Sequence, residues 1–212
     1  MIYHEEEGII LHHGDWRDID PELLKAQAIV TDPPYGIGEA AGKNKSRTNL
    51  AVAKDYGNDE WDNEPPSAYD IARLRALAPH QIIWGGNYFH LPPSKCWLVW
   101  DKVNSGDFAD CELAWTNLDK AVRLYKHMWN GMLREGNDVR VHPTQKPLAL
   151  IKWCLTHLPR DTKTVLDPYA GSGTTLVAAK AMGIHCIGVE REEKYCAEIV
   201  TRLRQQIIEF PS

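Results

Sequence analysis

The chain has 212 residues, 25% of them charged, and a formal net charge of −5, values that are ordinary for one globular domain. No stretch is long and apolar enough to span a membrane, and the acidic start of the chain argues against a signal or transit peptide. The five cysteines are scattered without a C-x-x-C pair, which disfavours a disulfide framework and a metal site and fits a reducing cytoplasm. We therefore expect a single cytoplasmic domain over residues 1–212, in which any nucleic-acid contact comes from a local basic patch.

Two short apolar runs near the start of the chain are each followed by an acid. The run Ile9-Ile10-Leu11 predicts a strand that ends shortly before Asp15, and a short helix is expected at 21–25. The run Ala28-Ile29-Val30 predicts a buried strand that leads into Asp32-Pro33-Pro34-Tyr35.

This stretch has the chemistry of a small polar pocket. Asp32 can accept a hydrogen bond, Pro33 and Pro34 leave their carbonyl oxygens free on a stiff backbone, and Tyr35 offers a flat face. Together they predict a pocket for a planar group that carries an NH2. A Pro-rich turn after a strand is the simpler alternative.

The segment 36–66 has neither helical nor strand periodicity. A loop of this length in a compact domain is typically a functional lid or a disordered segment. We interpret it as a lid that contacts phosphates without sequence preference, and a solvated loop is the alternative. Its basic residues are Lys43, Lys45, Arg47 and Lys54.

The middle of the chain predicts a capped helix and several short strands. Ser67 and Asp70 have the spacing of a capping box, and the helix that they open extends to about Ala78. Strands are expected at 81–84, 97–100, 111–116 and 122–125, the last two at the antiparallel end of a mixed sheet. Most of the tryptophans here are expected in the core, namely Trp97, Trp100, Trp115 and Trp129.

The last third predicts a unit typical of nucleotide-binding folds. A helix with an apolar face from Leu148 to Leu158 is followed by a strand that ends at Asp167 and by the turn Gly171-Ser172-Gly173. A helix, a strand that ends at Glu190 and a final amphipathic helix complete the chain. A dinucleotide-binding fold is a rival interpretation, but Leu176 stands where the third glycine of that fingerprint would fall.

Four acids follow the carboxyl ends of predicted strands, namely Asp15, Asp32, Asp167 and Glu190. Because ligands of open α/β sheets bind along that edge, we expect the four in one site. The predicted fold class is α/β, with a mixed and mostly parallel sheet and helices on both faces.

These motifs together resemble the DNA amino-methyltransferases, which methylate an exocyclic nitrogen of adenine or cytosine. Residues 32–35 resemble their catalytic motif, and His142 to Pro147 (HPTQKP) resemble a motif on their cofactor side. The order, with the catalytic motif first and the glycine turn last, is that of the β class, and 91–102 and 108–112 look like compact phage or prophage methylases. The resemblance covers most of the chain and implies the Rossmann-like class I methyltransferase fold.

The resemblance implies a cofactor, a substrate and a set of site residues. The cofactor would be S-adenosyl-L-methionine and the substrate a specific sequence in double-stranded DNA, as in restriction–modification, with no metal and a monomer or homodimer as the working unit. The Asp32 carboxylate and the Pro33 carbonyl would accept the N–H bonds of a flipped-out base, on which Tyr35 would stack. The cofactor-binding positions would be Asp15, Asp32, Thr144, Lys146, Asp167, Tyr169, Ala170, Gly171, Ser172, Gly173, Thr174 and Glu190.

Individual roles follow from the same resemblance. Thr144 and Lys146 would lie near the methionine carboxylate, Asp167 near the methionine amino group, and Glu190 at the ribose hydroxyls. Asp15 would face the adenine end of the cofactor, and Gly171 and Gly173 would let the backbone approach it. The basic loop cluster would contact DNA, and a small target-recognition region could lie at about 103–140.

The resemblance leaves the target base open between two nitrogens. Asp at the first catalytic position indicates adenine N6, whereas Ser would indicate cytosine N4, so adenine is the prediction and cytosine the alternative. The motif order disfavours methylation of RNA or of a protein amide. A non-catalytic nucleotide-binding module is the remaining alternative, and an intact Asp32-Pro33-Pro34-Tyr35 speaks against it.

Overall fold

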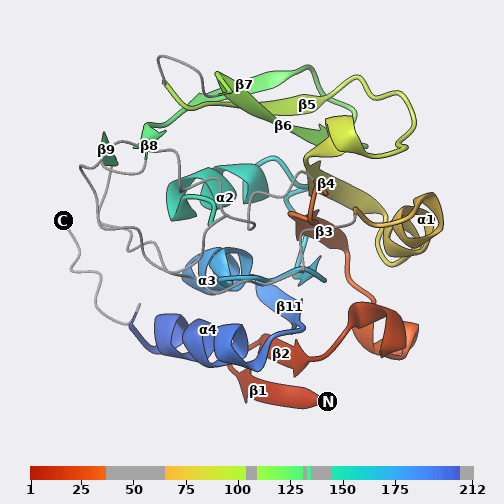
Figure 1. The fold of residues 1–212 in the computed structure, drawn as a ribbon, viewed down its shortest axis with the longest axis vertical. Helices are drawn as coiled ribbons and strands as arrows, with labels where there is room; N and C mark the ends of the chain where they lie inside the picture. The colour runs from red at the N-terminus through yellow and green to blue at the C-terminus, as the bar shows by residue number, and fades with distance from the viewer. Residues whose placement is uncertain (37–64, 104–108, 131–132, 135–144, 206–212) are drawn as a thin grey trace.

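The computed structural model describes residues 1–36, 65–103, 109–130, 133–134 and 145–205. Within this part of the chain, the strands form a nine-stranded sheet in the order β1-β2-β11-β10-β3-β4-β6-β5-β7, and β8 and β9 form a separate pair (Figure 1). Neighbouring strands from β2 to β4 run parallel, whereas β1 and β6 run antiparallel to their neighbours. The predicted α/β class with a mixed, mostly parallel sheet is confirmed.

The elements have the following bounds. The strands are β1 (Ile2–Glu6), β2 (Ile9–His13), β3 (Ala28–Thr31), β4 (His80–Trp84), β5 (Trp97–Asp101), β6 (Cys111–Thr116), β7 (Arg123–Lys126), β8 (Trp129–Asn130), β9 (Leu133–Arg134), β10 (Thr164–Asp167) and β11 (His185–Glu190). The α-helices are α1 (Ala68–Ala76), α2 (Leu148–Leu155), α3 (Thr174–Ala181) and α4 (Glu193–Gln205). Short 3-10 turns occur at η1 (Trp16–Asp18), η2 (Pro21–Leu24) and η5 (Gly86–Tyr88).

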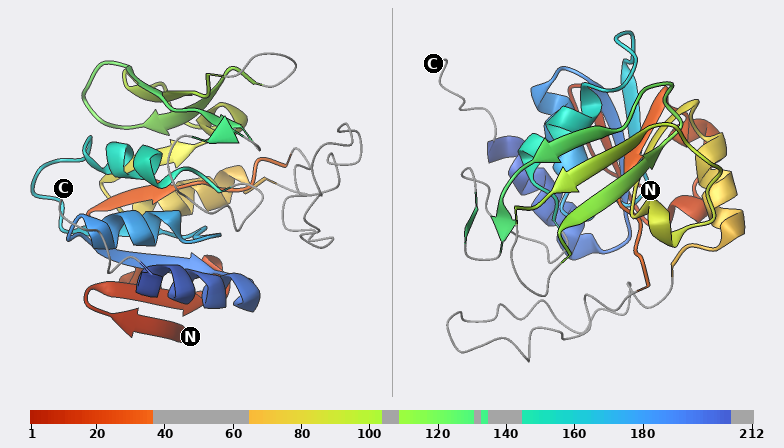
Figure 2. Two further views of the ribbon diagram at one scale, coloured as in Figure 1. Left: turned by 90° about the vertical axis from the view of Figure 1, so that its left-hand side faces the viewer. Right: turned by 90° about the horizontal axis from the view of Figure 1, so that it is seen from above.

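Helices cover both faces of the sheet. Helices α2, α3 and α4 lie on one face, and α1 with the turns η1 and η2 lies on the other (Figure 2). Alternate residues of β3 serve the two layers: Ala28 and Val30 belong to the core under α2 to α4, and Ile29 belongs to the core under α1. Strands that are buried on both faces need continuous apolar runs, which explains the sequence of β3 and β4.

The chain leaves the two central strands in opposite directions. From β10 it passes through α3 to β11, whereas from β3 it passes through α1 to β4, on the other side of the sheet. The adjacent strands β3 and β10 pair in parallel, with Ala28 opposite Val165 and Ile29 opposite Leu166. Their carboxyl ends form the topological switch point at which open α/β sheets bind ligands, and Asp32 and Asp167 lie there.

Most predicted elements are found, with some differences. The sequence did not predict β1, whose residues are largely exposed and whose polar pattern hides an edge strand. Strand β6 is antiparallel to its neighbours as expected, but β7 pairs with β5 in parallel. Helix α2 ends at Leu155 rather than Leu158, although Leu158 is buried. Trp100 and Trp115 are buried as expected, whereas Trp97 and Trp129 are only partly buried.

Three further expectations concern membrane-spanning helices, metal sites and disulfide bonds. In the described ranges, no helix is long and apolar enough to cross a membrane. The same residues contain no group of three or more His, Cys, Asp or Glu side chains that could hold a metal ion. All five cysteines are free thiols, and Cys111 alone among them is exposed.

Candidate active site

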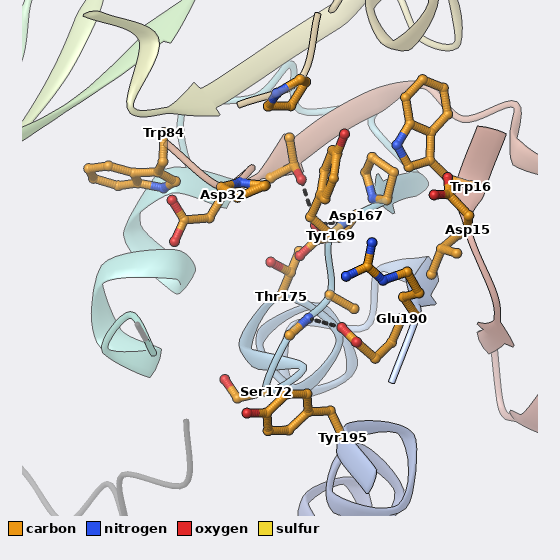
Figure 3. Close-up of a pocket in the computed structure, with 18 of the residues that line it drawn as sticks. Asp15, Trp16, Asp32, Trp84, Asp167, Tyr169, Ser172, Thr175, Glu190 and Tyr195 are labelled. Carbon is orange, nitrogen blue, oxygen red and sulfur yellow. Dashed lines mark hydrogen bonds between the residues drawn. The ribbon is translucent and has the colours of Figure 1, made fainter. Parts of the chain in front are cut away.

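A cavity of about 610 Å³ opens at the carboxyl ends of the central strands. Its volume lies within the range of roughly 300–1,000 Å³ that is usual for small-molecule sites. The four acids predicted to meet at this edge all line it, namely Asp15, Asp32, Asp167 and Glu190. Figure 3 shows Asp32 and Trp84 at one end of the cavity and Asp15 and Glu190 at the other, with Asp167 between them.

Asp167 is the most deeply buried of these acids, with 3% of its surface exposed. Its Oδ1 accepts hydrogen bonds from the Thr31 hydroxyl at 2.7 Å and from the Tyr169 backbone N–H at 3.2 Å. Burial raises the pKa of Asp167 to about 6, because desolvation penalises the charged form. A cationic ligand would favour the ionised carboxylate at this position.

Glu190 is held by the backbone. Its Oε2 accepts a hydrogen bond from the Gly171 N–H at 2.8 Å, which Figure 3 marks, and its Oε1 accepts one from the Glu192 N–H at 2.8 Å. Burial raises the pKa of Glu190 to about 7. Each carboxylate oxygen retains a second lone pair, so the side chain can still accept bonds from ligand hydroxyls.

The two glycines of the turn have different surroundings. Gly171 has a φ of +53°, and the nearest atom to the position of a Cβ would be 4.0 Å away, so the backbone there borders open space on the cavity wall. Gly173 has a φ of +75°, but a Cβ would lie 2.6 Å from Ile199 Cγ1 in α4. Gly173 is not among the residues that line the cavity. The prediction that both glycines admit a ligand therefore fits Gly171, whereas Gly173 serves the packing of α4.

Asp15 is already engaged by a cation. Its two carboxylate oxygens accept hydrogen bonds from the Arg17 Nε at 2.9 Å and Nη2 at 2.5 Å, and Asp15 also accepts from the Arg17 backbone N–H. These bonds lower the pKa of Asp15. Arg17 and its neighbour Trp16 line the cavity and were not predicted, although both stand beside Asp15 in the sequence.

Asp32 and Lys146 form a close ion pair. The Lys146 Nζ lies 2.6 Å from Asp32 Oδ2 and 3.0 Å from Glu112 Oε2, and the Tyr35 hydroxyl donates a hydrogen bond to Asp32 Oδ1. Burial lowers the pKa of Lys146, but the two carboxylates outweigh it and raise that pKa well above its ordinary value. Lys146 was expected beside a ligand carboxylate. In the structure its charge is met by two carboxylates of the protein.

Tyr35 is packed among other aromatic rings. It stacks on Tyr88 with ring centroids 5.0 Å apart and meets the Phe89 ring edge-on at 6.2 Å. The ring face that lies on Tyr88 is closed to a base. Gly85 packs against the same ring, because a Cβ there would lie 2.0 Å from Tyr35 Cε1.

The cavity also takes in residues that the sequence did not single out. Trp84 lines the cavity, and its indole nitrogen is buried without a hydrogen-bond partner within the described chain. Other unpredicted lining residues are Ser67, Asp70, Gln145, Thr175 and Tyr195. Ser67 and Asp70 form the capping box of α1, whereas Gln145, Thr175 and Tyr195 come from separate segments, so no single motif connects all five.

The remaining predicted positions divide into three groups. Tyr169, Ala170, Ser172 and Thr174 line the cavity, as does Pro34. Pro33 and Tyr35 are not among its lining residues, although Tyr35 reaches Asp32 through its hydroxyl. Thr144 and the basic cluster Lys43, Lys45, Arg47 and Lys54 lie outside the described residues.

Comparison with known proteins identifies the chain. The family described as DNA methylase, the N6/N4 methyltransferases, matches residues 92–201, which is more than half of the chain. The chain belongs to this DNA methylase family. It is a DNA methyltransferase, and its methyl donor is S-adenosylmethionine.

Individual relatives agree with this assignment. The type II methyltransferase M2.LlaDCHI of Lactococcus lactis subsp. cremoris is 26% identical, over 96% of this chain and 92% of its own length. The type II methyltransferase M2.DpnII of Streptococcus pneumoniae is 25% identical, over 91% of this chain and 88% of its own. These two type II methyltransferases thus resemble the chain over nearly its full length.

Solved structures share the fold at lower identity. The complex of M1.HpyAVI with SAM has a TM-score of 0.57 and 23% identity, covering 92% of this chain and 98% of that one. The PvuII DNA methyltransferase, described as cytosine-N4-specific, has a TM-score of 0.59 and 14% identity, covering 95% and 88%. These likenesses support the methyltransferase fold.

The residues of the cavity fit this cofactor. Its sulfonium and amino group are positive, and two buried carboxylates with raised pKa values face the cavity. The wall at Gly171 leaves open space beside a backbone that already orients Glu190.

Proposed function

We propose that this DNA methyltransferase transfers the methyl group to the exocyclic N6 amine of adenine. One observation carries the proposal: the Asp32 carboxylate lines the same cavity as Asp167 and Glu190. A hydrogen-bond acceptor for an amine and two acids suited to the methyl donor therefore share one space. The presence of Asp at the first catalytic position favours adenine within the family.

The donor side of the cavity has a proposed role for each polar group. Asp167 would pair with the amino group of the methionine moiety, Glu190 would accept bonds from the ribose hydroxyls, and Trp84 would offer its free N–H. When bound, S-adenosylmethionine supplies an electrophilic methyl group on a positively charged sulfur. Thr144 stays a predicted contact of the methionine carboxylate.

The acceptor side activates a poor nucleophile. The lone pair of the adenine amine is delocalised into the ring, and hydrogen bonds from the amine to Asp32 and to the Pro33 carbonyl would draw the nitrogen toward a tetrahedral shape. The nitrogen would take up the methyl carbon as its bond to sulfur breaks, which would leave neutral S-adenosylhomocysteine, and the released proton would pass to the Asp32 carboxylate that accepts the N–H bond and then to water. Alignment of the two reactants can supply much of the acceleration.

The target base must leave the duplex to reach this cavity. Tyr35 would contact the flipped base with the part of its ring that Tyr88 does not cover. The cluster Lys43, Lys45, Arg47 and Lys54 would contact DNA phosphates. A recognition sequence would be read from 103–140, and the whole chain would act as one domain.

The test is methyl transfer from labelled cofactor to unmethylated double-stranded DNA, followed by digestion to nucleosides. Label in N6-methyl-2′-deoxyadenosine is the expected result, and label in N4-methyl-2′-deoxycytidine would overturn the adenine assignment. Asp32→Ala should abolish transfer while cofactor affinity, measured by calorimetry, changes little. Near-parental transfer by that variant would exclude Asp32 as the amine acceptor.

A further inference from the structure

Four charged side chains of alternating sign form a line that ends at the cavity. Lys102 forms an ion pair with Glu112, Glu112 Oε2 lies 3.0 Å from Lys146 Nζ, and Lys146 Nζ lies 2.6 Å from Asp32 Oδ2. Glu112 belongs to β6, whereas Lys102 directly follows β5, Lys146 precedes α2 and Asp32 follows β3. Separate segments of the chain therefore converge on one line of charge.

Lys146 is the most shielded member of this line. Its side chain is 8% exposed, whereas those of Asp32, Glu112 and Lys102 are 23%, 23% and 20% exposed. Asp32 and Lys146 line the cavity, whereas Glu112 is not among its lining residues. Glu112 therefore lies behind Lys146, where it can act on the reaction only through its neighbours.

We propose that Glu112 is a positioning residue for methyl transfer: it holds the Lys146 ammonium in place against Asp32 and offsets its positive charge. This inference rests on the proposed role of Asp32 as the acceptor of the amine. Lys102 would complete the arrangement by partly neutralising Glu112.

The physical reason lies in the charge that develops during the reaction. The attacking nitrogen becomes positive before it loses its proton, and a nearby ammonium opposes that charge. Lys146 fixes the orientation of Asp32 but, on its own, would place such an opposing charge beside the amine. Glu112 at 3.0 Å supplies the compensating negative charge in a site with little water.

The groups around Asp32 also predict how its pKa should change when Glu112 or Lys146 is replaced. The groups that face it are Lys146, Tyr35, Glu112 and, across the switch point, Asp167. Burial raises the pKa of Asp32, the Lys146 charge lowers it, and the Glu112 charge raises it. Because Asp32 must be ionised to accept the amine hydrogen bond, the rate of methyl transfer should fall at low pH, and this fall is the acid limb of the pH–rate profile. Loss of Glu112 should lower the pKa of Asp32 and loss of Lys146 should raise it, so the two losses should move the acid limb in opposite directions.

The experiment measures single-turnover methyl transfer against pH for Glu112→Gln and Lys146→Met, together with the cofactor Kd and the Tm. In Glu112→Gln the rate constant should fall roughly 10- to 100-fold, with a cofactor Kd within about twofold of the parent. Its acid limb should move to lower pH, whereas that of Lys146→Met should move to higher pH. The matched control is Asp119→Asn, which breaks the exposed Lys95–Asp119 pair at 2.9 Å and should leave rate and limb unchanged.

A parental rate in folded Glu112→Gln, an unmoved limb, or limbs that move in the same direction would overturn the proposal. If Glu112→Gln does not fold, Lys102→Met provides the test, and its limb should move to higher pH because Glu112 is then less neutralised. An unmoved limb in Lys102→Met would equally overturn it. Full activity of Asp32→Ala would instead refute the proposed role of Asp32, so the two failures are distinguishable.

Discussion

Replacing Asp167 by asparagine should stabilise the cofactor-free protein while it weakens cofactor binding. Asp167 is 3% exposed, and burial raises its pKa from 3.8 to about 6. A carboxyl whose pKa is higher in the folded state than in the unfolded state lowers stability as pH rises between the two values. The asparagine Oδ1 can still accept the hydrogen bonds from Thr31 and Tyr169, and its amide can donate to the Thr175 hydroxyl, so the variant loses the buried charge but keeps a partner for each of these contacts.

The magnitude follows from the shift in pKa. A difference of about 2 pKa units corresponds to about 3 kcal/mol above the folded pKa, and the gain should shrink to about 1 kcal/mol near pH 4.5. For a chain of this size, about 3 kcal/mol corresponds to a rise in Tm of roughly 6–12 °C near pH 8. Cofactor affinity should fall about 10- to 100-fold, because a charged hydrogen bond to the amino group is lost.

Thermal unfolding of the cofactor-free variant near pH 8 and near pH 4.5, followed by circular dichroism, measures this effect. The matched control is Asp161→Asn, an exposed aspartate shortly before the same strand, which should change the Tm little at either pH. A Tm equal to or below that of the parent near pH 8 would refute the reasoning. A gain that does not shrink at low pH would refute its electrostatic origin.

Two further predictions concern the cofactor carboxylates and the Tyr35 pocket. Cofactor affinity, measured by calorimetry, should rise as pH increases from about 5 to 8, because Asp167 and Glu190 ionise with pKa values of about 6 and 7 and bind a cation better when charged; an affinity independent of pH would contradict this. Gly85→Ala should destabilise the protein by roughly 2 kcal/mol or more and slow methyl transfer, because a Cβ at φ +66° would lie 2.0 Å from Tyr35 Cε1. Gly183→Ala, at φ +67° in open space, is the control for backbone strain alone, and an equal loss of activity in both variants would contradict the steric explanation.

The sequence predicted the sheet well because its central strands are apolar runs with acids at their ends. The four acids do meet in one cavity, since parallel strands bring their carboxyl ends to one edge. The partners of Lys146 could not be predicted in this way. Glu112 is 34 residues away in the sequence on a half-exposed strand, and only the position of β6 between β4 and β5 brings its carboxylate to the ammonium.

The partners of the Tyr35 ring could not be predicted from the sequence either. Its motif predicted a free stacking face, but Tyr88, more than fifty residues later in the turn η5, occupies one side of the ring. The exposed edge strand β1 was missed for another reason. Its residues are mostly exposed, and three of the five are consecutive polar residues, so no alternating apolar pattern is visible.

The divergence of the chain at β3 and β10 separates the two chemical tasks of the enzyme. Asp167 and Glu190, proposed to hold the donor, stand at the ends of β10 and β11, whereas Asp32, Pro33 and Tyr35, proposed to hold the base, follow β3. Evolution can therefore reshape the acceptor half for a different amine while the donor half keeps its sequence. The same fold can therefore act on different target amines while its cofactor-binding residues stay unchanged.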